Sequence, residues 1–284
     1  MQARAVAEAL AQAGASAVEL VTVRTSGDRS AVGDKSRFVK ELEDALLQGG
    51  IDVAVHSAKD VPGALPDGLT LVGAPPAEDA RDALVGMGPV ADLPERARIG
   101  TSSVRRRSQL LAHRPDLDVV PLRGNVDTRL AKLAGGDFDA ALLALAGLRR
   151  LGRDGGAFPI ECDEMVPAPG QGILALEARA GESRIGELCD RLSDRTALSR
   201  LGAERGFVTH LDASCHTPVG AHATVDGDAV HVDGYVGLPD GSEWIRDRLS
   251  GSRGEGADLG RRLAERMLAA GAGDLLRRAE ALAA

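Results

Sequence analysis

The chain has 284 residues, of which 44% are hydrophobic and 27% are charged, a composition typical of a soluble globular protein with two or three domains. The formal net charge of −8 argues against nucleic acid as a partner, because the phosphate backbone attracts basic surfaces. No apolar run approaches the ~20 residues that cross a bilayer, and no apolar signal segment follows Met1, so we expect a cytoplasmic protein without a membrane partner.

The first 75 residues alternate predicted helices with predicted strands. Helical spacing of apolar residues predicts a helix over 2–13, and a second helix, which Ser36 can cap, runs to Gly49. Short β-branched runs predict strands over 18–23, 51–55 and 69–72. This alternation favours an α/β domain with a doubly wound sheet of parallel strands. The chain opens with a helix, although a domain of this kind usually opens with a strand.

Two segments are typical of crossings between domains. The first is Pro75-Pro76, after which the composition changes. The second is the rigid, glycine-flanked stretch PAPGQG at 167–172. Between them, strands predicted over 82–85, 119–122 and 138–145 alternate with helices in a second α/β unit. From about Ser193 the pattern changes to helices and hairpin strands, which is typical of a small α+β domain. The predicted domains are 1–75 with 173–191, 76–172 and 192–284.

A single aspartate follows the strand predicted at 51–55. The strand is expected to stop at His56, and Asp60 comes after the turn, beside the cation of Lys59. Ligands of open α/β sheets bind outside the carboxyl ends of the strands, which makes Asp60 a candidate for chemistry. An isolated Asp more often ends a strand or caps a helix, so both interpretations stay open on this stretch alone. His56 is expected to be a structural hydrogen-bonding residue.

The segment GTSSVRRR at 100–107 combines a glycine turn, three hydroxyls and three guanidinium groups at the start of a predicted helix. Positive charge on the first turn of a helix opposes the helix dipole, at a cost of ~0.3–1 kcal/mol for each residue. Three such arginines favour a bound polyanion, because helix N-termini and bidentate arginines both bind carboxylates. The alternative is a solvated helix face whose arginines pair with Asp or Glu. Further arginines follow other strand ends and extend the predicted cationic cleft: Arg123, Arg129, Arg149 and Arg150.

Lysines are rare and unevenly placed. Of the 34 basic residues only four are lysines, at positions 35, 40, 59 and 132, and three of these fall between 35 and 59. A compact ammonium group is therefore expected near Asp60, where a planar guanidinium would not serve.

The three cysteines are Cys162, Cys189 and Cys215. They have no metal-ligand spacing and leave one over from any pairing, so we expect no metal and reduced thiols. Cys162 and Cys189 are expected to be small buried hydrophobes. Cys215 lies in a polar loop beside His216, whose imidazole could lower the pKa of the thiol, and it is a candidate nucleophile or attachment point.

Six motifs occur in one order along the chain: HSAKDVP, GTSSVRRR, PLRGNVDTRL, LALAGLRRLG, PAPGQG and SCHTPVG. Together they resemble the porphobilinogen deaminase (hydroxymethylbilane synthase) family over nearly the whole chain. The resemblance implies two doubly wound α/β domains like those of periplasmic binding proteins, plus a small C-terminal α+β domain. It also implies a monomeric transferase of haem biosynthesis that condenses four porphobilinogens head to tail into hydroxymethylbilane and releases ammonia.

The resemblance further implies which residues carry the reaction. Asp60 matches the catalytic aspartate of the family, and Lys59 would help to orient it. A dipyrromethane cofactor would be attached through a thioether to Cys215. Its other contacts would be Lys35, Lys59, Asp60, Ser103, Arg105, Arg106 and Arg129. The substrate contacts would be Arg123, Arg129, Arg150 and Gln171.

These residue types suit that chemistry. Each pyrrole carries an acetate and a propionate group, so a growing chain of pyrroles is a polyanion that needs arginine and lysine partners. Loss of ammonia from porphobilinogen leaves an electron-poor azafulvene, which the free carbon of the terminal pyrrole attacks. A carboxylate at the pyrrole nitrogens can stabilise the positive charge and assist proton transfer.

The sequence departs from the family at its beginning. The family begins with a strand that carries an arginine and a serine in contact with the cofactor, and no residues here correspond to it. We therefore expect this sequence to begin downstream of the true start. A form limited to residues 1–284 is expected to load cofactor poorly and to have a destabilised first domain. The loop at 30–37 is also shorter than is usual in the family.

Two other functions are compatible with part of the pattern. A non-enzymatic anion-binding protein on the same two-lobed fold needs the arginine clusters but neither Asp60 nor a modified Cys215. A thiol hydrolase could use Cys215 with His216, but adjacent residues in an extended loop point apart, which is poor geometry for such a pair.

Overall fold

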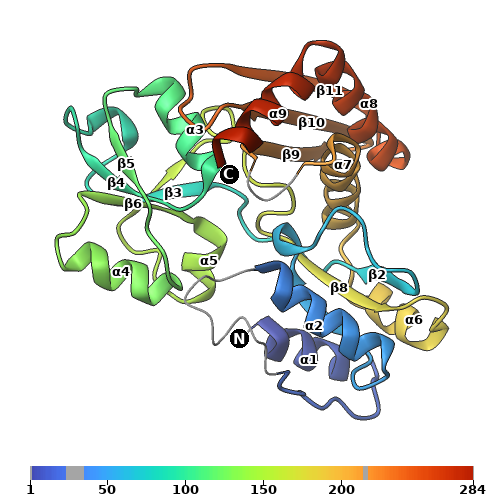
Figure 1. Cartoon of the computed structure of the whole chain (residues 1–284). Coiled ribbons are helices and arrows are strands. Elements are labelled where there is room, and N and C mark those ends of the chain that lie inside the picture. Colours follow the sequence, from blue (N-terminus) through green and yellow to red (C-terminus); the bar gives the residue numbers. More distant parts are fainter. Residues whose placement is uncertain (1, 24–34, 214–216, 284) are drawn as a thin grey trace.

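The structure is a computed structural model that describes residues 2–23, 35–213 and 217–283, without the side chains of residues 35–38 and 283. Figure 1 shows three lobes, each built on one β-sheet with helices packed against it. Two lobes are α/β and the third is a small α+β lobe, which confirms the predicted fold class. No helix in the described ranges is long and apolar enough to cross a membrane.

The first lobe is built from two segments that lie far apart in the sequence. Its elements are α1 (Gln2–Gln12), α2 (Lys35–Leu47), β1 (Ala54–Ser57), β2 (Leu69–Gly73), β8 (Leu174–Arg179) and α6 (Ser183–Leu192). The strand order is β1-β8-β2, and both outer strands run antiparallel to β8. The expected parallel pairing is therefore wrong for this sheet, because β8 returns from the second lobe and inserts between the other two strands.

Residues 18–23 form no strand, contrary to prediction. Leu20 is 50% exposed and Val21 is 54% exposed, so the apolar run does not enter a core. A strand needs a neighbour to pair its backbone groups, and none of the described residues supplies one here.

Other local predictions for the first lobe are confirmed or shifted. The helix predicted over 2–13 and the strand over 69–72 agree with α1 and β2 to within one residue. The strand predicted at 51–55 is displaced to Ala54–Ser57, so His56 lies inside it rather than after it. Helix α2 begins at Lys35, so Ser36 lies within the helix rather than capping it.

The second lobe has a five-stranded sheet in the middle of the chain. Its elements are β3 (Asp82–Gly86), β4 (Arg98–Gly100), α3 (Val104–His113), β5 (Asp118–Val120), α4 (Val126–Ala134), β6 (Ala140–Ala144), α5 (Leu145–Arg150) and β7 (Ala157–Ile160). The order is β5-β4-β6-β3-β7, with β4 parallel to β5 and β6 but β3 antiparallel to β6 and β7. The sheet is thus mixed, and its inner strands bury Leu84, Ile99 and Leu142 completely.

The C-terminal lobe packs helices on an antiparallel meander. Its elements are α7 (Arg195–Leu211), β9 (Val219–Asp226), β10 (Ala229–Gly237), β11 (Trp244–Ser252), α8 (Gly256–Ala269) and α9 (Ala272–Ala283). The strand order is β11-β10-β9, and Phe207 and Leu263 are fully buried against it. Gly271, with a φ of +104°, separates α8 from α9.

Short 3-10 turns and two crossings complete the chain. The turns are η2 (Ala58–Asp60), η3 (Val90–Asp92) and η4 (Arg253–Glu255). The crossings between the first two lobes are residues 74–81 and residues 167–173. Glu78 N donates a hydrogen bond of 3.0 Å to Gly172 O, so the two crossings run side by side next to η2.

Candidate active site

The turn η2, at the carboxyl end of β1, carries Lys59 and Asp60. Ala58 N donates to Ile173 O at 3.0 Å, and Val61 N closes the turn on Ala58 O at 3.2 Å. Asp60 is half-buried and lines a pocket of about 280 Å³. The other lining residues are Gln2, Ala3, Val39, Val55, His56 and Ser57. A carboxylate and an ammonium group therefore follow one another at a strand end, beside a cavity.

A buried pair supports β1 behind this pocket. His56 Nε2 lies 2.9 Å from Glu177 Oε2 of β8, and the two residues are 3% and 0% exposed. Glu43 of α2 is also buried, and burial together with the charge of Glu177 raises the pKa of Glu43. The prediction that His56 is a structural hydrogen-bonding residue is confirmed.

The second crossing packs directly against η2. Gly170 has a φ of +76°, and a Cβ atom there would lie 2.8 Å from the carbonyl carbon of Ala58 and 2.9 Å from Lys59 N. Only glycine allows this close approach. The next residue, Gln171, is 1% exposed, and its Oε1 accepts a hydrogen bond of 3.2 Å from Lys59 Nζ. The crossing thus fixes the turn and contacts its ammonium group.

Two of the three arginines on the first turn of α3 are buried around an aspartate. Asp82, the first residue of β3, is 0% exposed, and Arg105 Nη1 donates to its Oδ2 at 2.7 Å. Arg106 Nε donates to Asp82 Oδ1 at 2.9 Å. Burial alone would raise the pKa of Asp82, but the two guanidinium groups outweigh burial and lower it well below its usual range. The guanidinium groups of Arg105 and Arg106 therefore pair with a buried carboxylate inside the protein. They do not lie on a solvated helix face.

Two further arginines beside this cluster donate to backbone carbonyls. Arg129 Nε donates to Gly124 O at 2.8 Å, and Arg150 Nη2 donates to Gly172 O at 2.8 Å. Burial lowers the pKa of both guanidinium groups. Burial also lowers the pKa of Arg106, and the nearby charge of Arg129 adds to this effect. Arg129 is therefore within electrostatic reach of the buried arginine pair.

The remaining predicted site residues are more dispersed. Ser103 caps α3, since its Oγ accepts from Arg106 N at 3.4 Å. Arg123 is exposed, and its carbonyl accepts from Lys132 Nζ at 3.3 Å. The Lys35 side chain and Cys215 lie outside the described residues.

Glu204 of α7, which no sequence motif singled out, lies behind the second crossing. Its Oε2 accepts from Gly170 N at 2.6 Å, and its Oε1 accepts from Ala223 N at 2.9 Å. His222 Nδ1 lies 3.7 Å from the same Oε1. Burial disfavours the imidazolium of His222, but contacts with Cys162 and Glu204 outweigh burial and raise the pKa of His222 to about 9. The C-terminal lobe thus holds the crossing that packs on η2.

Asp82 and Glu204 were not predicted as site residues, and only Asp82 carries a signal in the sequence. Asp82 directly precedes the apolar run 83–85, and a charged residue is buried there only with a partner. The arginines of GTSSVRRR were available as that partner, so this pairing could have been found. Glu204 carries no such signal, because it lies in a helix with several other charged residues.

The two described cysteines, Cys162 and Cys189, form no disulfide with each other. No group of three or more His, Cys, Asp or Glu in the described ranges is placed to hold a metal ion. Cys189 is buried, as expected, and burial raises its pKa to about 11. Cys162 is only half-buried, contrary to expectation, and its side chain contacts His222.

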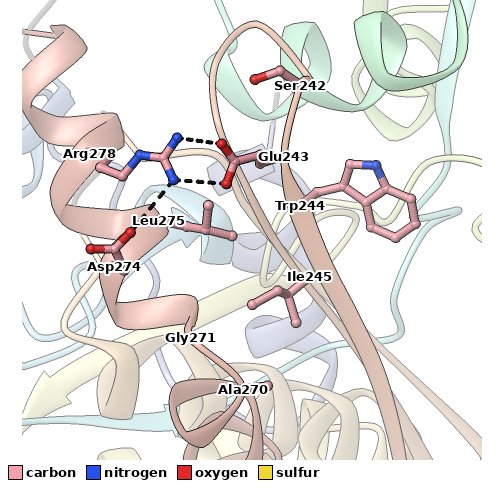
Figure 2. Close-up of a pocket in the computed structure, with 9 residues that line it drawn as sticks. All are labelled: Ser242, Glu243, Trp244, Ile245, Ala270, Gly271, Asp274, Leu275 and Arg278. Atoms are coloured by element: carbon pink, nitrogen blue, oxygen red, sulfur yellow. Dashed lines mark hydrogen bonds and ion pairs between the residues drawn. The ribbon is translucent and has the colours of Figure 1, made fainter.

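A larger pocket, of about 480 Å³, lies in the C-terminal lobe between β11 and α9 (Figure 2). Arg278 reaches from α9 to Glu243, with hydrogen bonds of 2.8 Å and 2.5 Å, and lies 3.6 Å from Asp274. These charged groups satisfy one another, and none of the residues that line this pocket was predicted as a site residue. The candidate active site is therefore the pocket at Asp60.

Two family models match the chain. The model described as "Porphobilinogen deaminase, dipyromethane cofactor binding domain" matches residues 1–187. The model described as "Porphobilinogen deaminase, C-terminal domain" matches residues 198–269.

Individual relatives agree with the family models. The porphobilinogen deaminase of Deinococcus deserti is 48% identical over 269 residues, which cover 90% of this chain and 86% of that protein. That of Campylobacter concisus is 44% identical over 277 residues, which cover 94% of this chain and 89% of that protein. Among solved structures, the periplasmic VFT2 domain of BvgS from Bordetella pertussis is 19% identical with a TM-score of 0.41, covering 66% of this chain and 75% of that one.

Proposed function

The chain belongs to the porphobilinogen deaminase family, and from this premise we propose how its residues perform the reaction. It is a transferase of tetrapyrrole biosynthesis that condenses four porphobilinogens head to tail into hydroxymethylbilane and releases ammonia. The proposal includes its finer assignment as a hydroxymethylbilane synthase that works as a monomer on porphobilinogen.

The observation that carries the proposal is the connection between η2 and the arginine pair of α3. Lys59 Nζ donates to Gln171, and Gln171 Nε2 donates to Asp82 at 2.9 Å. Lys59, the chain neighbour of Asp60, is therefore connected through Gln171 and Asp82 to the arginine pair of α3. A polyanion of linked pyrroles needs cations for its carboxylates and an anion for its transient positive charge.

Asp60 is the proposed catalytic residue. When ammonia leaves porphobilinogen, positive charge develops on the pyrrole, and a carboxylate beside the ring nitrogen stabilises it. After the new carbon–carbon bond forms, the ring whose free carbon attacked must lose the proton on that carbon, and the same carboxylate can assist this transfer. Lys59 orients Asp60 from the adjacent position.

The proposed ligands of the substrate carboxylates are Arg123, Arg129 and Arg150. Arg129 and Arg150 are partly buried cations whose described hydrogen bonds go to neutral carbonyl oxygens, which leaves their charge available to an anion. A charge-assisted pair with a carboxylate would compensate the burial that lowers their pKa values.

A dipyrromethane cofactor fits the donor set of this site. Arg105 Nε is buried and has no hydrogen-bond partner among the described residues, which is a position that an anionic oxygen would fill. When bound, the cofactor supplies the anchored primer to which substrate units are added. We assign its attachment to the thiol of Cys215. Its carboxylates are assigned to Lys35, Lys59, Ser103, Arg105, Arg106 and Arg129.

The three lobes support the proposed domain bounds, which are 1–75 with 173–191, 76–172 and 192–284. Each range contains one complete sheet of the described structure, with β8 as the strand that returns to the first domain. The hydrogen bonds of the site cross from the first range to the second through residue 171.

Intact mass spectrometry of the purified protein tests the proposal. A loaded fraction is expected whose mass exceeds that of the sequence by one dipyrromethane. Its modified peptide contains Cys215, and Cys215→Ser has only the unmodified mass. An unmodified chain that binds carboxylate anions but does not consume porphobilinogen would contradict the proposal and favour a non-enzymatic anion-binding protein.

A further inference from the structure

Gln171 is enclosed by the protein and fully engaged with it. The residue is 1% exposed, and its amide makes three hydrogen bonds within the chain. Nε2 donates to Ala80 O at 2.7 Å and to Asp82 Oδ1 at 2.9 Å, while Oε1 accepts from Lys59 Nζ at 3.2 Å. Both hydrogens of Nε2 thus go to oxygens, and the oxygen of the amide is left to face the ammonium group.

Two acceptors fix the orientation of this amide, the carbonyl oxygen of Ala80 and the ionised carboxylate of Asp82. The guanidinium groups of Arg105 and Arg106 outweigh the effect of burial and keep the pKa of Asp82 well below its usual range. An ionised carboxylate can only accept, so the nitrogen must face Asp82 and the oxygen must face Lys59.

We propose that Gln171 and Asp82 are positioning residues for Lys59, which hold its ammonium group at the turn that carries Asp60 and tie that turn to the arginine pair of α3. The inference rests on the proposed roles of Lys59 and Asp60. It replaces the expected contact of Gln171 with substrate by an action through Lys59. A lysine side chain that loses an acceptor samples more rotamers, and a misplaced charge beside the reacting atoms slows the chemical step.

A double-mutant cycle between Gln171 and Lys59 tests this inference. Gln171→Met keeps the length of the side chain but removes every hydrogen bond, and we expect kcat to fall about tenfold to a hundredfold with little change in KM. Because Gln171 acts through Lys59, adding Gln171→Met to Lys59→Met should lower kcat no further. Intact mass must show equal cofactor attachment in the variants, so that kcat refers to loaded enzyme.

Two further variants separate positioning from structural support. Gln171→Glu keeps an acceptor for Lys59 but sets a second carboxylate against Asp82, so it should unfold more easily than Gln171→Met and yet be the more active variant. Gln109→Met removes another buried glutamine, whose amide bonds both backbone groups of Val166, and should lower stability with no dependence on Lys59.

The outcomes that overturn the inference are distinct. Additive effects of Gln171→Met and Lys59→Met, a rise in KM alone, or activity that follows stability across all variants would each refute positioning through Lys59. Normal turnover by Lys59→Met would refute the proposed role of Lys59, and this inference with it.

Discussion

The backbone amide of Gly170 donates a hydrogen bond of 2.6 Å to the buried Oε2 of Glu204, and this contact joins the C-terminal lobe to the crossing that packs on the turn η2. Glu204 is 1% exposed, and its other oxygen accepts from Ala223 N at 2.9 Å. One carboxylate on α7 therefore satisfies backbone donors from two separate segments.

Removal of the Glu204 carboxylate is expected to destabilise the whole chain. Glu204→Ala leaves two buried amides without acceptors and the cations of Arg200 and His222 without a counter-charge, so the free energy of unfolding should fall by about 3–5 kcal/mol. Glu204→Gln keeps one acceptor oxygen and should lose about 1–3 kcal/mol. Urea unfolding at neutral pH measures both values, and midpoints equal to that of the unsubstituted protein would contradict the role given to Glu204.

A methyl group at position 170 should disturb the turn η2, which carries the proposed catalytic residue Asp60. Gly170→Ala places Cβ against Ala58 and the backbone nitrogen of Lys59, so we expect turnover to fall by about 10- to 100-fold. Gly136→Ala is the matched control, because Gly136 has a φ of +82° but nothing within 4 Å of its Cβ position. Both variants carry similar backbone strain, of about 1–2 kcal/mol, whereas only Gly170→Ala should lose activity. Equal activity of the two variants would show that this close approach does not matter.

The stability of the protein should depend on His222 between pH 6.5 and about 9. The pKa of His222 in the folded chain is about 9, above its ordinary value of 6.5, so its contribution is complete below pH 6.5 and disappears as the pH rises through 9. The expected loss is on the order of 3 kcal/mol. It should be absent in His222→Gln and retained in His231→Gln, since His231 contacts Ser250 on the same sheet. Parallel pH profiles for His222→Gln and the unsubstituted protein would contradict this assignment.

We expect substitution of the partly buried Arg129 and Arg150 to lower kcat/KM more than substitution of the exposed Arg107. Arg129→Gln and Arg150→Gln each remove a proposed charged partner of a pyrrole carboxylate, and we expect kcat/KM for porphobilinogen to fall by about 10- to 100-fold. Arg107→Gln is the control, because Arg107 is exposed on the same arginine run of α3. Similar losses in all three variants would indicate a general effect of net charge rather than specific carboxylate contacts.

Local sequence patterns predicted most helices and central strands of this fold. The apolar spacing in residues 2–13 and 138–145 was sufficient to predict a helix and a strand. The helix buries one face in its own lobe, and the strand buries both faces. The strand prediction for residues 18–23 was wrong, because strand formation depends on pairing with a neighbouring strand. Local propensity carries no information about that neighbour. The antiparallel insertion of β8 between β1 and β2 could not be predicted either. The sequence indicates that the chain crosses back to the first lobe, but not in which direction the returning strand runs.

The candidate site was predicted in its parts but not in its connections. Asp60 and Lys59 stood out as a charged pair after a strand, and the arginines stood out as a cluster. The buried bonds that join them run through Gln171 and Asp82, between residues about 90 positions apart in the sequence. Such long-range pairing depends on how two lobes pack, which no local pattern encodes.

The most important proposed role in this protein is the stabilisation, by Asp60, of the positive charge formed when ammonia leaves porphobilinogen. Its most direct test is the rate of porphobilinogen consumption by Asp60→Asn, normalised to the amount of attached cofactor determined by intact mass. The account predicts a rate lower by about 100- to 1,000-fold, because the amide keeps the shape of the side chain but not its charge. A loaded Asp60→Asn enzyme that consumes porphobilinogen at the unsubstituted rate would contradict it.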